Sequence, residues 1–370
     1  MALFRFSDLR GHRAPLAALQ RLVARGLAGH AYLFEGPAGV GKDTVAQAFL
    51  ARLACVGALA EAADACGLCR SCAALLRSEH PDMTRIAKDG ASIKIDQVRD
   101  SLKRLRYEPT VGRIKGVLVE SADLLREEAA NALLKTLEEP PSATVFVLVT
   151  SKPQRLLDTI RSRCQALRFA ELSLDDVAAL LVAENVPADE ARVAAALAQG
   201  SMHRARELCD PARMAVVDLV ARFTLGLGTT PPSDAAGFVD ALGAQVALVG
   251  ATAEAAETET EASTAGATAP PSVAATPPGK VGREDLQGVI DVVRAVLRDA
   301  LLVGAGQDPD TLPHARYAAD LRRLAGRCDA GRLLEVVDAC GRLEDRLTVN
   351  PNPRLALQAL LVDAAQRMKA

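Results

Sequence analysis

The stretch that decides the fold, residues 31–50, reads "AYLFEGPAGVGKDTVAQAFL". A short apolar run leads into a glycine-rich turn, and apolar residues at helical spacing follow the turn. In this context, backbone N–H groups converge on phosphate oxygens and a lysine reaches the β and γ phosphates. The sequence therefore predicts a phosphate-binding loop between a strand and a helix. Its candidate nucleotide-binding residues are Gly36, Gly39, Gly41, Lys42, Asp43 and Thr44.

Two motifs differ from their usual sequence in a working nucleotidase. The loop pattern normally continues after its lysine with a Ser or Thr that ligates Mg²⁺, whereas this chain has Asp43. The next predicted strand, residues 116–120, normally ends in an Asp–Glu pair, which here reads Glu120 and Ser121. Because Ser is a poor general base, we expect hydrolysis to be lost, while binding of ATP or ADP stays open. The alternative is a helix N-terminus that Asp43 caps and that holds no ligand.

The first 170 residues alternate between strand and helix patterns. Val-rich runs at 116–120 and 144–150 predict buried strands. Between them, "REEAANALLKTLEEPP" (126–141) predicts a helix that its two prolines end. This alternation indicates an α/β domain with a parallel sheet over residues 1–170.

Residues after 170 read as helices. We expect a small helical domain over 171–211 and a second helical domain over 212–370. The segment 251–282 interrupts the second domain with Ala, Thr, Pro and Glu and almost no large apolar residue. Such a segment buries too little surface to offset its ordering entropy, so we expect it to be disordered.

Four cysteines gather in "CVGALAEAADACGLCRSC" (55–72). The candidate ligands are Cys55, Cys66, Cys69 and Cys72. Four thiolates suit tetrahedral Zn²⁺, and closed sites of this kind are structural. A Cys₄ iron–sulfur cluster has a similar ligand set and is the alternative. We favour structural zinc.

Bulk composition excludes some classes of protein. The chain has 370 residues and a net charge of -2, so overall electrostatics do not mark an autonomous nucleic-acid binder. Aromatic residues are only 3%, which favours helical cores of Leu, Val and Ala. We find no apolar run of membrane-spanning length and no secretion signal, so we expect a cytoplasmic protein.

One stretch resembles a known family closely. "NALLKTLEEPPSATVFVLVTSKPQRLLDTIRSRCQALRF" (131–169) is similar to the bacterial replicative clamp-loader family, as are "HAYLFEGPAGVGK" (30–42), "HPD" (80–82) and "IKIDQVRDSL" (93–102). "RLTVNPNPRLALQALLVD" (346–363) resembles the end of that family's collar domain. The resemblance implies an α/β plus α architecture: an AAA+ P-loop domain with an inserted zinc module, a helical lid and a helical collar.

The family contains ATPase members of the gamma/tau type and stator members. The altered acidic pair is typical of the stator. The family also carries an arginine in a Ser-Arg-Cys motif, which here implies that Arg163 is an arginine finger acting in trans on a neighbour's ATP. A surface arginine that caps a helix end is the alternative. His203 stands where the family's lid often has arginine, and Thr150 falls at a polar sensor position.

The resemblance also implies partners. They are the gamma/tau and delta subunits, with the sliding clamp and primer-template DNA reached through the assembled complex. Two other readings remain: a gamma/tau-type ATPase that hydrolyses ATP itself, and a non-replicative AAA+ adaptor.

Overall fold

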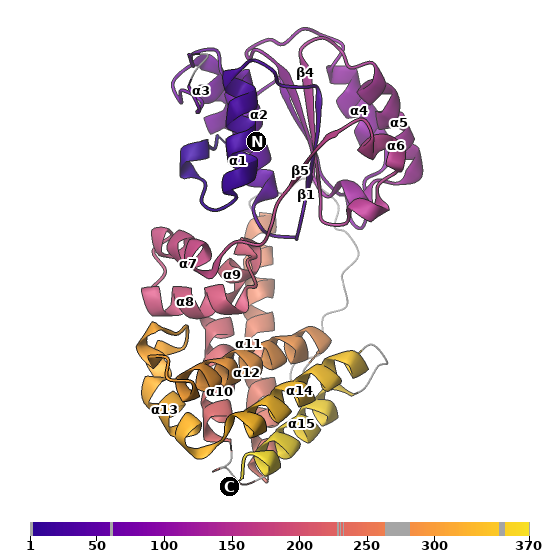
Figure 1. The fold of residues 1–370 in the computed structure, drawn as a ribbon. Coiled ribbons are helices and arrows are strands. Elements are labelled where there is room, and N and C mark those ends of the chain that lie inside the picture. The colour runs from indigo at the N-terminus through magenta and orange to yellow at the C-terminus, as the bar shows by residue number, and fades with distance from the viewer. Residues whose placement is uncertain are drawn as a thin grey trace. The chain divides into compact units, whose positions relative to one another are not determined.

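The computed structural model describes residues 3–59, 62–227, 229, 231, 233–262, 282–347 and 352–369. The chain divides into two compact units (Figure 1). Unit 1 comprises Met1–Asp176 and Gly200–His203, and unit 2 comprises Val177–Gln199 and Arg204–Ala370. Unit 1 is α/β, whereas the described elements of unit 2 are all helices.

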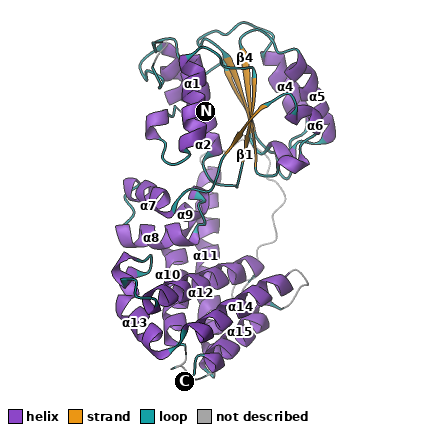
Figure 2. Cartoon of the chain, in the orientation of Figure 1, coloured by secondary structure: helices purple, strands orange, loops and turns teal. Residues whose placement is uncertain are grey.

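A parallel sheet forms the centre of unit 1. Its strands are β1 (Ala31–Glu35), β2 (Met83–Ile86), β3 (Lys115–Val119), β4 (Thr144–Thr150) and β5 (Gln165–Arg168). The strand order is β2-β3-β4-β1-β5 and every pairing is parallel. Figure 2 shows these strands between two groups of helices. The predicted parallel α/β sheet is therefore confirmed.

Alternating side chains divide the core of unit 1 into two layers. Along β1, Tyr32 and Phe34 enter one apolar cluster, while Ala31 and Leu33 enter the other. This is the period of two that a strand imposes. The first cluster packs against α1 (Arg13–Ala24) and α2 (Lys42–Ala54), and the second against α4 (Ile95–Arg104) and α5 (Glu127–Glu138). A short helix, α3 (Arg70–Leu76), follows α2, and α6 (Asp158–Arg161) follows β4.

The two edge strands were not predicted. In β5 only Leu167 is buried, and in β2 Arg85 is exposed. Each strand is four residues long, so neither gives the continuous apolar run that identifies the central strands.

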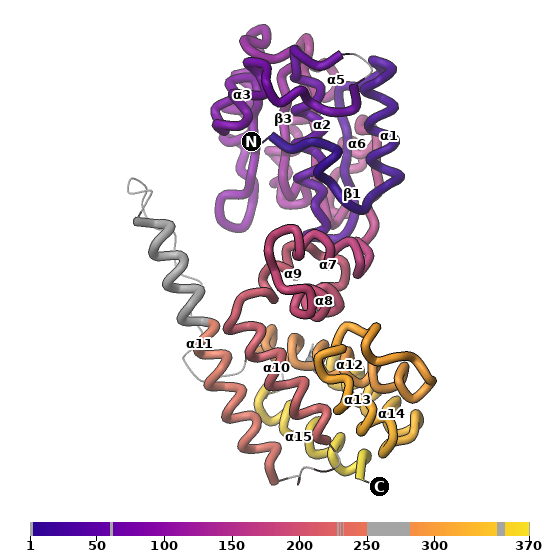
Figure 3. The backbone as a smooth tube through the Cα atoms, turned by 90° about the vertical axis from the view of Figure 1, so that its left-hand side faces the viewer, coloured from indigo at the N-terminus to yellow at the C-terminus, as the bar shows by residue number. Residues whose placement is uncertain are grey.

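Unit 2 is built from helices, which Figure 3 shows as coils of the backbone tube. They are α7 (Leu174–Ala183, which begins at the end of unit 1), α8 (Ala188–Leu197), α9 (Met202–Leu208), α10 (Pro211–Gly226), α11 (Asp234–Ala262), α12 (Arg283–Gly304), α13 (Ala318–Arg327), α14 (Ala330–Leu347) and α15 (Pro353–Arg367). The helical pattern at 188–209 is broken between α8 and α9, where Gly200 has a φ of +75°. No helix within the described residues is long and apolar enough to cross a membrane.

The predicted disordered segment 251–282 overlaps a helix. The structure continues α11 to Ala262, and α12 is capped by Gly282. Ala and Glu, which dominate the first part of this segment, are strong helix formers. The rest of the segment, residues 263–281, lies outside the described residues.

Candidate functional site

The phosphate-binding loop lies between the end of β1 and the start of α2, as predicted. Gly39 has a φ of +75°, and a Cβ added there would lie 2.1 Å from Ser201 Oγ. Only glycine adopts this backbone without strain. Lys42 is buried, and its Nζ donates hydrogen bonds to the carbonyl oxygens of Gly36, at 2.8 Å, and Pro37. The frame of the loop is therefore intact, and its lysine is held against the loop backbone.

Asp43 replaces the usual hydroxyl in the first turn of α2. Burial raises the pKa of Asp43, and the nearby carboxylate of Glu120 raises it further. Its Oδ1 is buried and has no hydrogen-bond partner among the described residues. The position that would supply a neutral hydroxyl to Mg²⁺ thus holds a carboxyl group that is costly to ionise. Thr44, one residue further on, is half-buried.

Glu120 follows β3 directly, at the position of the first acid of the usual pair. Arg85 of β2 donates to both of its oxygens, from Nε at 2.6 Å and from Nη2 at 2.8 Å. The side chain of Glu120 is only 16% exposed. Ser121 has a φ of +49°, an uncommon conformation for a residue other than glycine. The carboxylate at this position is therefore engaged by an arginine, and the next residue offers no carboxylate.

Thr150, at the end of β4, is fully buried and lies at the same edge of the sheet. Its Oγ1 donates to Asp123 Oδ1 at 2.7 Å. Burial lowers the pKa of Lys42, while the charges of Asp43 and Asp123 oppose this effect. Asp123 is thus a member of the site that sequence reasoning missed. Its signal would have been an acid three residues after Glu120, just beyond the end of a strand.

Two histidines contact the phosphate-binding loop. His203 donates its backbone N–H to the Gly39 carbonyl oxygen at 3.3 Å, which places the predicted lid position beside the loop. His12 Nε2 lies 2.7 Å from the Val40 carbonyl oxygen. Because a carbonyl only accepts, Nε2 of His12 carries the proton. The His12 ring also packs edge-on against Phe169, with the ring centroids 5.0 Å apart. His12 was not predicted, since nothing in its local sequence links it to the loop.

Arg163 lies just after α6, on the surface of unit 1. Its Nη1 donates to the Thr159 carbonyl oxygen at 2.9 Å and to Ser162 Oγ at 3.4 Å. Its Nη2 forms an ion pair with Glu138 Oε1 at 2.6 Å. Arg163, the predicted finger residue, therefore takes no part in the polar contacts of the phosphate-binding loop given above. Its side chain is 36% exposed.

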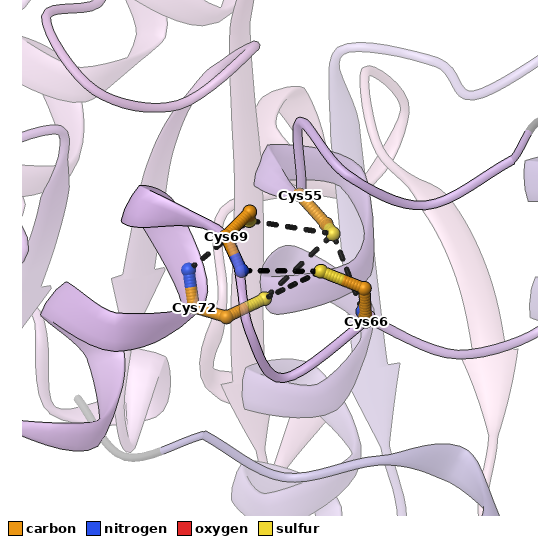
Figure 4. A group of neighbouring side chains, drawn as sticks. All are labelled: Cys55, Cys66, Cys69 and Cys72. Carbon is orange, nitrogen blue, oxygen red and sulfur yellow. Dashed lines mark hydrogen bonds between the residues drawn. The ribbon is translucent and has the colours of Figure 1, made fainter.

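The four predicted cysteines come together in one cluster, as Figure 4 shows. Their sulfur atoms all lie within 4.8 Å of one another. Cys55 Sγ is 3.8 Å from Cys69 Sγ and 3.7 Å from Cys72 Sγ, and Cys66 Sγ is 4.0 Å from Cys72 Sγ. Four sulfurs placed tetrahedrally at the usual Zn–S distance would be about 3.8 Å apart. The cluster therefore has the dimensions of a tetrahedral metal site.

Backbone N–H groups support negative charge in this cluster. The N–H of Cys66 points to Cys55 Sγ at 3.3 Å, and that of Cys69 points to Cys66 Sγ at 3.3 Å. Burial acts to raise the pKa of the Cys69 thiol, but backbone N–H groups outweigh it and lower the pKa to about 6. Burial raises the pKa of Cys72. Backbone donors directed at the sulfurs of Cys55, Cys66 and Cys69, within a cluster of four sulfurs, fit a bound metal ion better than four neutral thiols.

Comparisons with known proteins find similarity to DNA polymerase III subunits. Residues 11–173 match the family model described as "DNA polymerase III, delta subunit". The chain is 38% identical over 216 residues to the DNA polymerase III subunit tau/gamma of Haemophilus influenzae, covering 56% of this chain and 30% of that protein. It is 41% identical over 198 residues to the DNA polymerase III subunit delta' of Pseudomonas aeruginosa, covering 52% of this chain and 59% of that protein.

The chain is therefore similar, over its first part, to subunits of the DNA polymerase III clamp loader. It spans less than two thirds of the length of these two relatives. A solved DNA polymerase III gamma subunit-related protein from Thermotoga maritima aligns with 96% of the chain, with a TM-score of 0.38 and 16% identity. In this chain the phosphate-binding loop, the ends of β3 and β4 and the backbone contact of His203 meet at one edge of the sheet.

The chain thus keeps the glycine-rich frame of a phosphate-binding loop, but the residues around that frame differ from those of a working nucleotidase. The glycines and Lys42 can still surround a phosphate. Asp43 and Glu120 add two carboxylates close to where a triphosphate would lie, and Ser121 cannot act alone as a base. The arrangement can therefore surround a phosphate, but it lacks the Asp–Glu pair that follows the strand in a working nucleotidase.

Proposed function

We propose that this chain is the delta prime subunit of a DNA polymerase III clamp loader. It would act as a stator that assembles with gamma/tau and delta subunits. Arg163 would reach the ATP site of a neighbouring subunit and stabilise charge on the transferred phosphoryl group, as arginine fingers do. The assembled complex would load the sliding clamp onto primer-template DNA.

The observation that carries this proposal is the state of the residues after β3. Both oxygens of Glu120 accept hydrogen bonds from Arg85, and Ser121 replaces the residue that would activate water. At the same time Arg163 lies at the surface with an intact Ser-Arg-Cys motif. A chain with a weakened site of its own and an exposed arginine is suited to serving another subunit's ATP.

The remaining parts of this assignment are proposed with it. The four cysteines would hold a structural Zn²⁺, with Cys55, Cys66, Cys69 and Cys72 as ligands. Residues 1–170 would be the AAA+ domain, 171–211 the lid and 212–370 the collar that joins the subunits. The glycine-rich loop, from Gly36 to Thr44, would bind ATP or ADP only statically.

The test is reconstitution with gamma/tau and delta subunits, followed by measurement of DNA- and clamp-stimulated ATPase. An arginine finger contributes about 10³–10⁵ to turnover at the site it serves. We therefore expect Arg163→Ala to abolish turnover at one neighbouring site, with complex assembly unchanged. Arg155→Ala, which removes another exposed arginine of unit 1, is the matched control and should have no effect. Equal ATPase rates for Arg163→Ala and wild-type complexes would refute the finger.

A second candidate is a gamma/tau-type ATPase. The 38% identity to the tau/gamma subunit of Haemophilus influenzae and the retained Lys42 favour it. This reading predicts that the purified chain hydrolyses ATP by itself and that Lys42→Ala abolishes the activity. The delta prime proposal predicts no turnover by the isolated chain, so this one measurement separates the two.

A further inference from the structure

We propose that Glu138 parks the side chain of Arg163 in the free subunit and releases it when a neighbouring subunit presents nucleotide phosphate. The inference rests on the proposed function, because it takes Arg163 as the arginine finger. It assigns to Glu138 the role of a positioning residue. The carboxylate acts as a substitute anion until the phosphoryl group of the neighbour's nucleotide takes its place.

The contacts of Arg163 leave part of its guanidinium open. Nη1 donates hydrogen bonds to Thr159 and Ser162, and Nη2 forms an ion pair with Glu138. The Nε–H has no hydrogen-bond acceptor among the described residues and is left for an incoming oxygen. Thr159 and Ser162 belong to the same short segment as Arg163, whereas Glu138 comes from α5. Glu138 is therefore the contact that fixes the direction of the side chain relative to the domain.

The position of Glu138 in its helix indicates that its charge serves a partner. Glu138 is the last residue of α5, and Glu139 caps that end. The C-terminus of a helix carries partial negative charge, so acidic residues there are unfavourable and a nearby cation is favourable. Lys135 in the last turn of α5 is one such cation, and Arg163 is a second, which pairs directly with Glu138.

The ion pair between Arg163 and Glu138 is weak enough to break when a competing anion arrives. The side chains of Arg163 and Glu138 are 36% and 49% exposed. Loss of an exposed ion pair of this kind shifts an equilibrium by about 1.4- to 5-fold. A triphosphate offers more negative charge and several acceptor oxygens, and arginine binds phosphate in a bidentate manner. Exchange of Glu138 for phosphate is therefore favourable once the neighbour's nucleotide is within reach.

The first test needs no ATPase activity. Arginine side-chain ¹⁵N NMR of the full-length free chain reports whether the Arg163 guanidinium rotates, with Arg163→Lys assigning its signal. We expect restricted rotation in the wild type and faster rotation in Glu138→Gln. Glu139→Gln removes the same charge from the next, exposed residue and should leave the signal unchanged. An identical Arg163 signal in wild type and Glu138→Gln would overturn the proposal.

The second test uses the complex with gamma/tau and delta subunits. Freeing Arg163 should raise kcat/KM for ATP by about 1.4- to 5-fold in Glu138→Gln, mainly through a lower KM, with Glu139→Gln unchanged. A fall in kcat comparable to that of Arg163→Ala would show that Glu138 orients the working finger, which overturns parking. Unchanged kinetics would also overturn it. If Arg163→Ala itself has no effect, the proposed function fails, while the NMR result still reports on the ion pair.

Discussion

The carboxylate of Asp82 provides the sharpest test of how unit 1 holds the segment 55–72 that carries the four clustered cysteines, here called the cysteine module. Its two oxygens accept hydrogen bonds from three successive backbone N–H groups, those of Thr110, Val111 and Gly112, each at 2.7 Å. Asp82 itself is only 7% exposed. The loop that it holds also contacts the cysteine module, because Arg70 Nε donates to the Val111 carbonyl oxygen at 3.1 Å. Asp82 thus ties the sheet, this loop and the module together.

Replacing Asp82 with alanine removes both acceptor oxygens and thus all three hydrogen bonds. Leaving a buried donor unpaired costs about 1–3 kcal/mol, and water can reach part of this loop, so we use the lower value for each bond. The expected local destabilisation is about 3 kcal/mol. Lys115 continues to hold residues 105 and 107 through its Nζ, so the loss should be confined to the following residues.

Hydrogen exchange measured by mass spectrometry resolves this loop from the rest of the chain. A local loss of about 3 kcal/mol corresponds to roughly 100-fold faster exchange of residues 108–114. Exchange in β4 should not change. Asp100→Ala removes an exposed carboxylate that pairs only with the exposed Lys103, and it is the matched control. If Asp82→Ala changes exchange at 108–114 by less than about threefold, Asp82 does not hold the loop.

The stabilisation that the Asp82 hydrogen bonds provide depends on pH in a defined way. Burial acts to raise the pKa of Asp82, but the N–H groups of Gly112, Thr110 and Val111 hold it below its ordinary value. A carboxyl group whose pKa is depressed by folding stabilises the folded state above its unfolded pKa of about 3.9. That contribution is lost as the pH falls through the lower folded pKa. The difference between wild type and Asp82→Ala should therefore be constant above about pH 5 and shrink below about pH 4.

Two further predictions follow from the site. Elemental analysis should find one Zn²⁺ per chain. Chelation of the metal, or the substitution Cys69→Ser, should release it and speed proteolysis of the 55–76 region. The control Cys340→Ser should do neither. A chain that holds no metal and whose proteolysis does not change would contradict the site. Gly36→Ala would place a Cβ 2.2 Å from the Phe169 carbonyl oxygen, at a φ of +151°. Thermal unfolding should show unit 1 destabilised by about 1–3 kcal/mol, and an unchanged transition would contradict this close packing.

Central strands and the phosphate-binding loop were predictable because their signals are local. Runs such as "TVFVLVT" are buried on both faces, and the loop needs only a strand, glycines and a lysine in order. The cysteine cluster was predictable for the same reason, since its ligands span only 55–72. The edge strands are only four residues long and include the exposed residues Arg85 in β2 and Gln165, Ala166 and Arg168 in β5, so they leave no comparable pattern.

Contacts between distant segments were not predictable. Nothing near Glu138 in sequence marks it as the partner of Arg163, because their proximity depends on how α5 and α6 pack. His12 and Asp123 likewise reach the phosphate-binding loop and β4 from separate loops that only the parallel sheet brings to one edge. Sequence patterns identify which chemical groups a domain carries, whereas the topology decides which of them meet.

The altered residues beside the phosphate-binding loop interact with one another electrostatically. Glu120 raises the pKa of Asp43, and Arg85 lowers it while accepting Glu120 as its ion-pair partner. Changing Asp43 alone would remove one carboxylate but leave Glu120 bound to Arg85. Changing Glu120 alone would leave the cation Arg85 without its partner beside Asp43. Because contacting residues do not contribute additively, the effects of changing Asp43 and Glu120 should not sum.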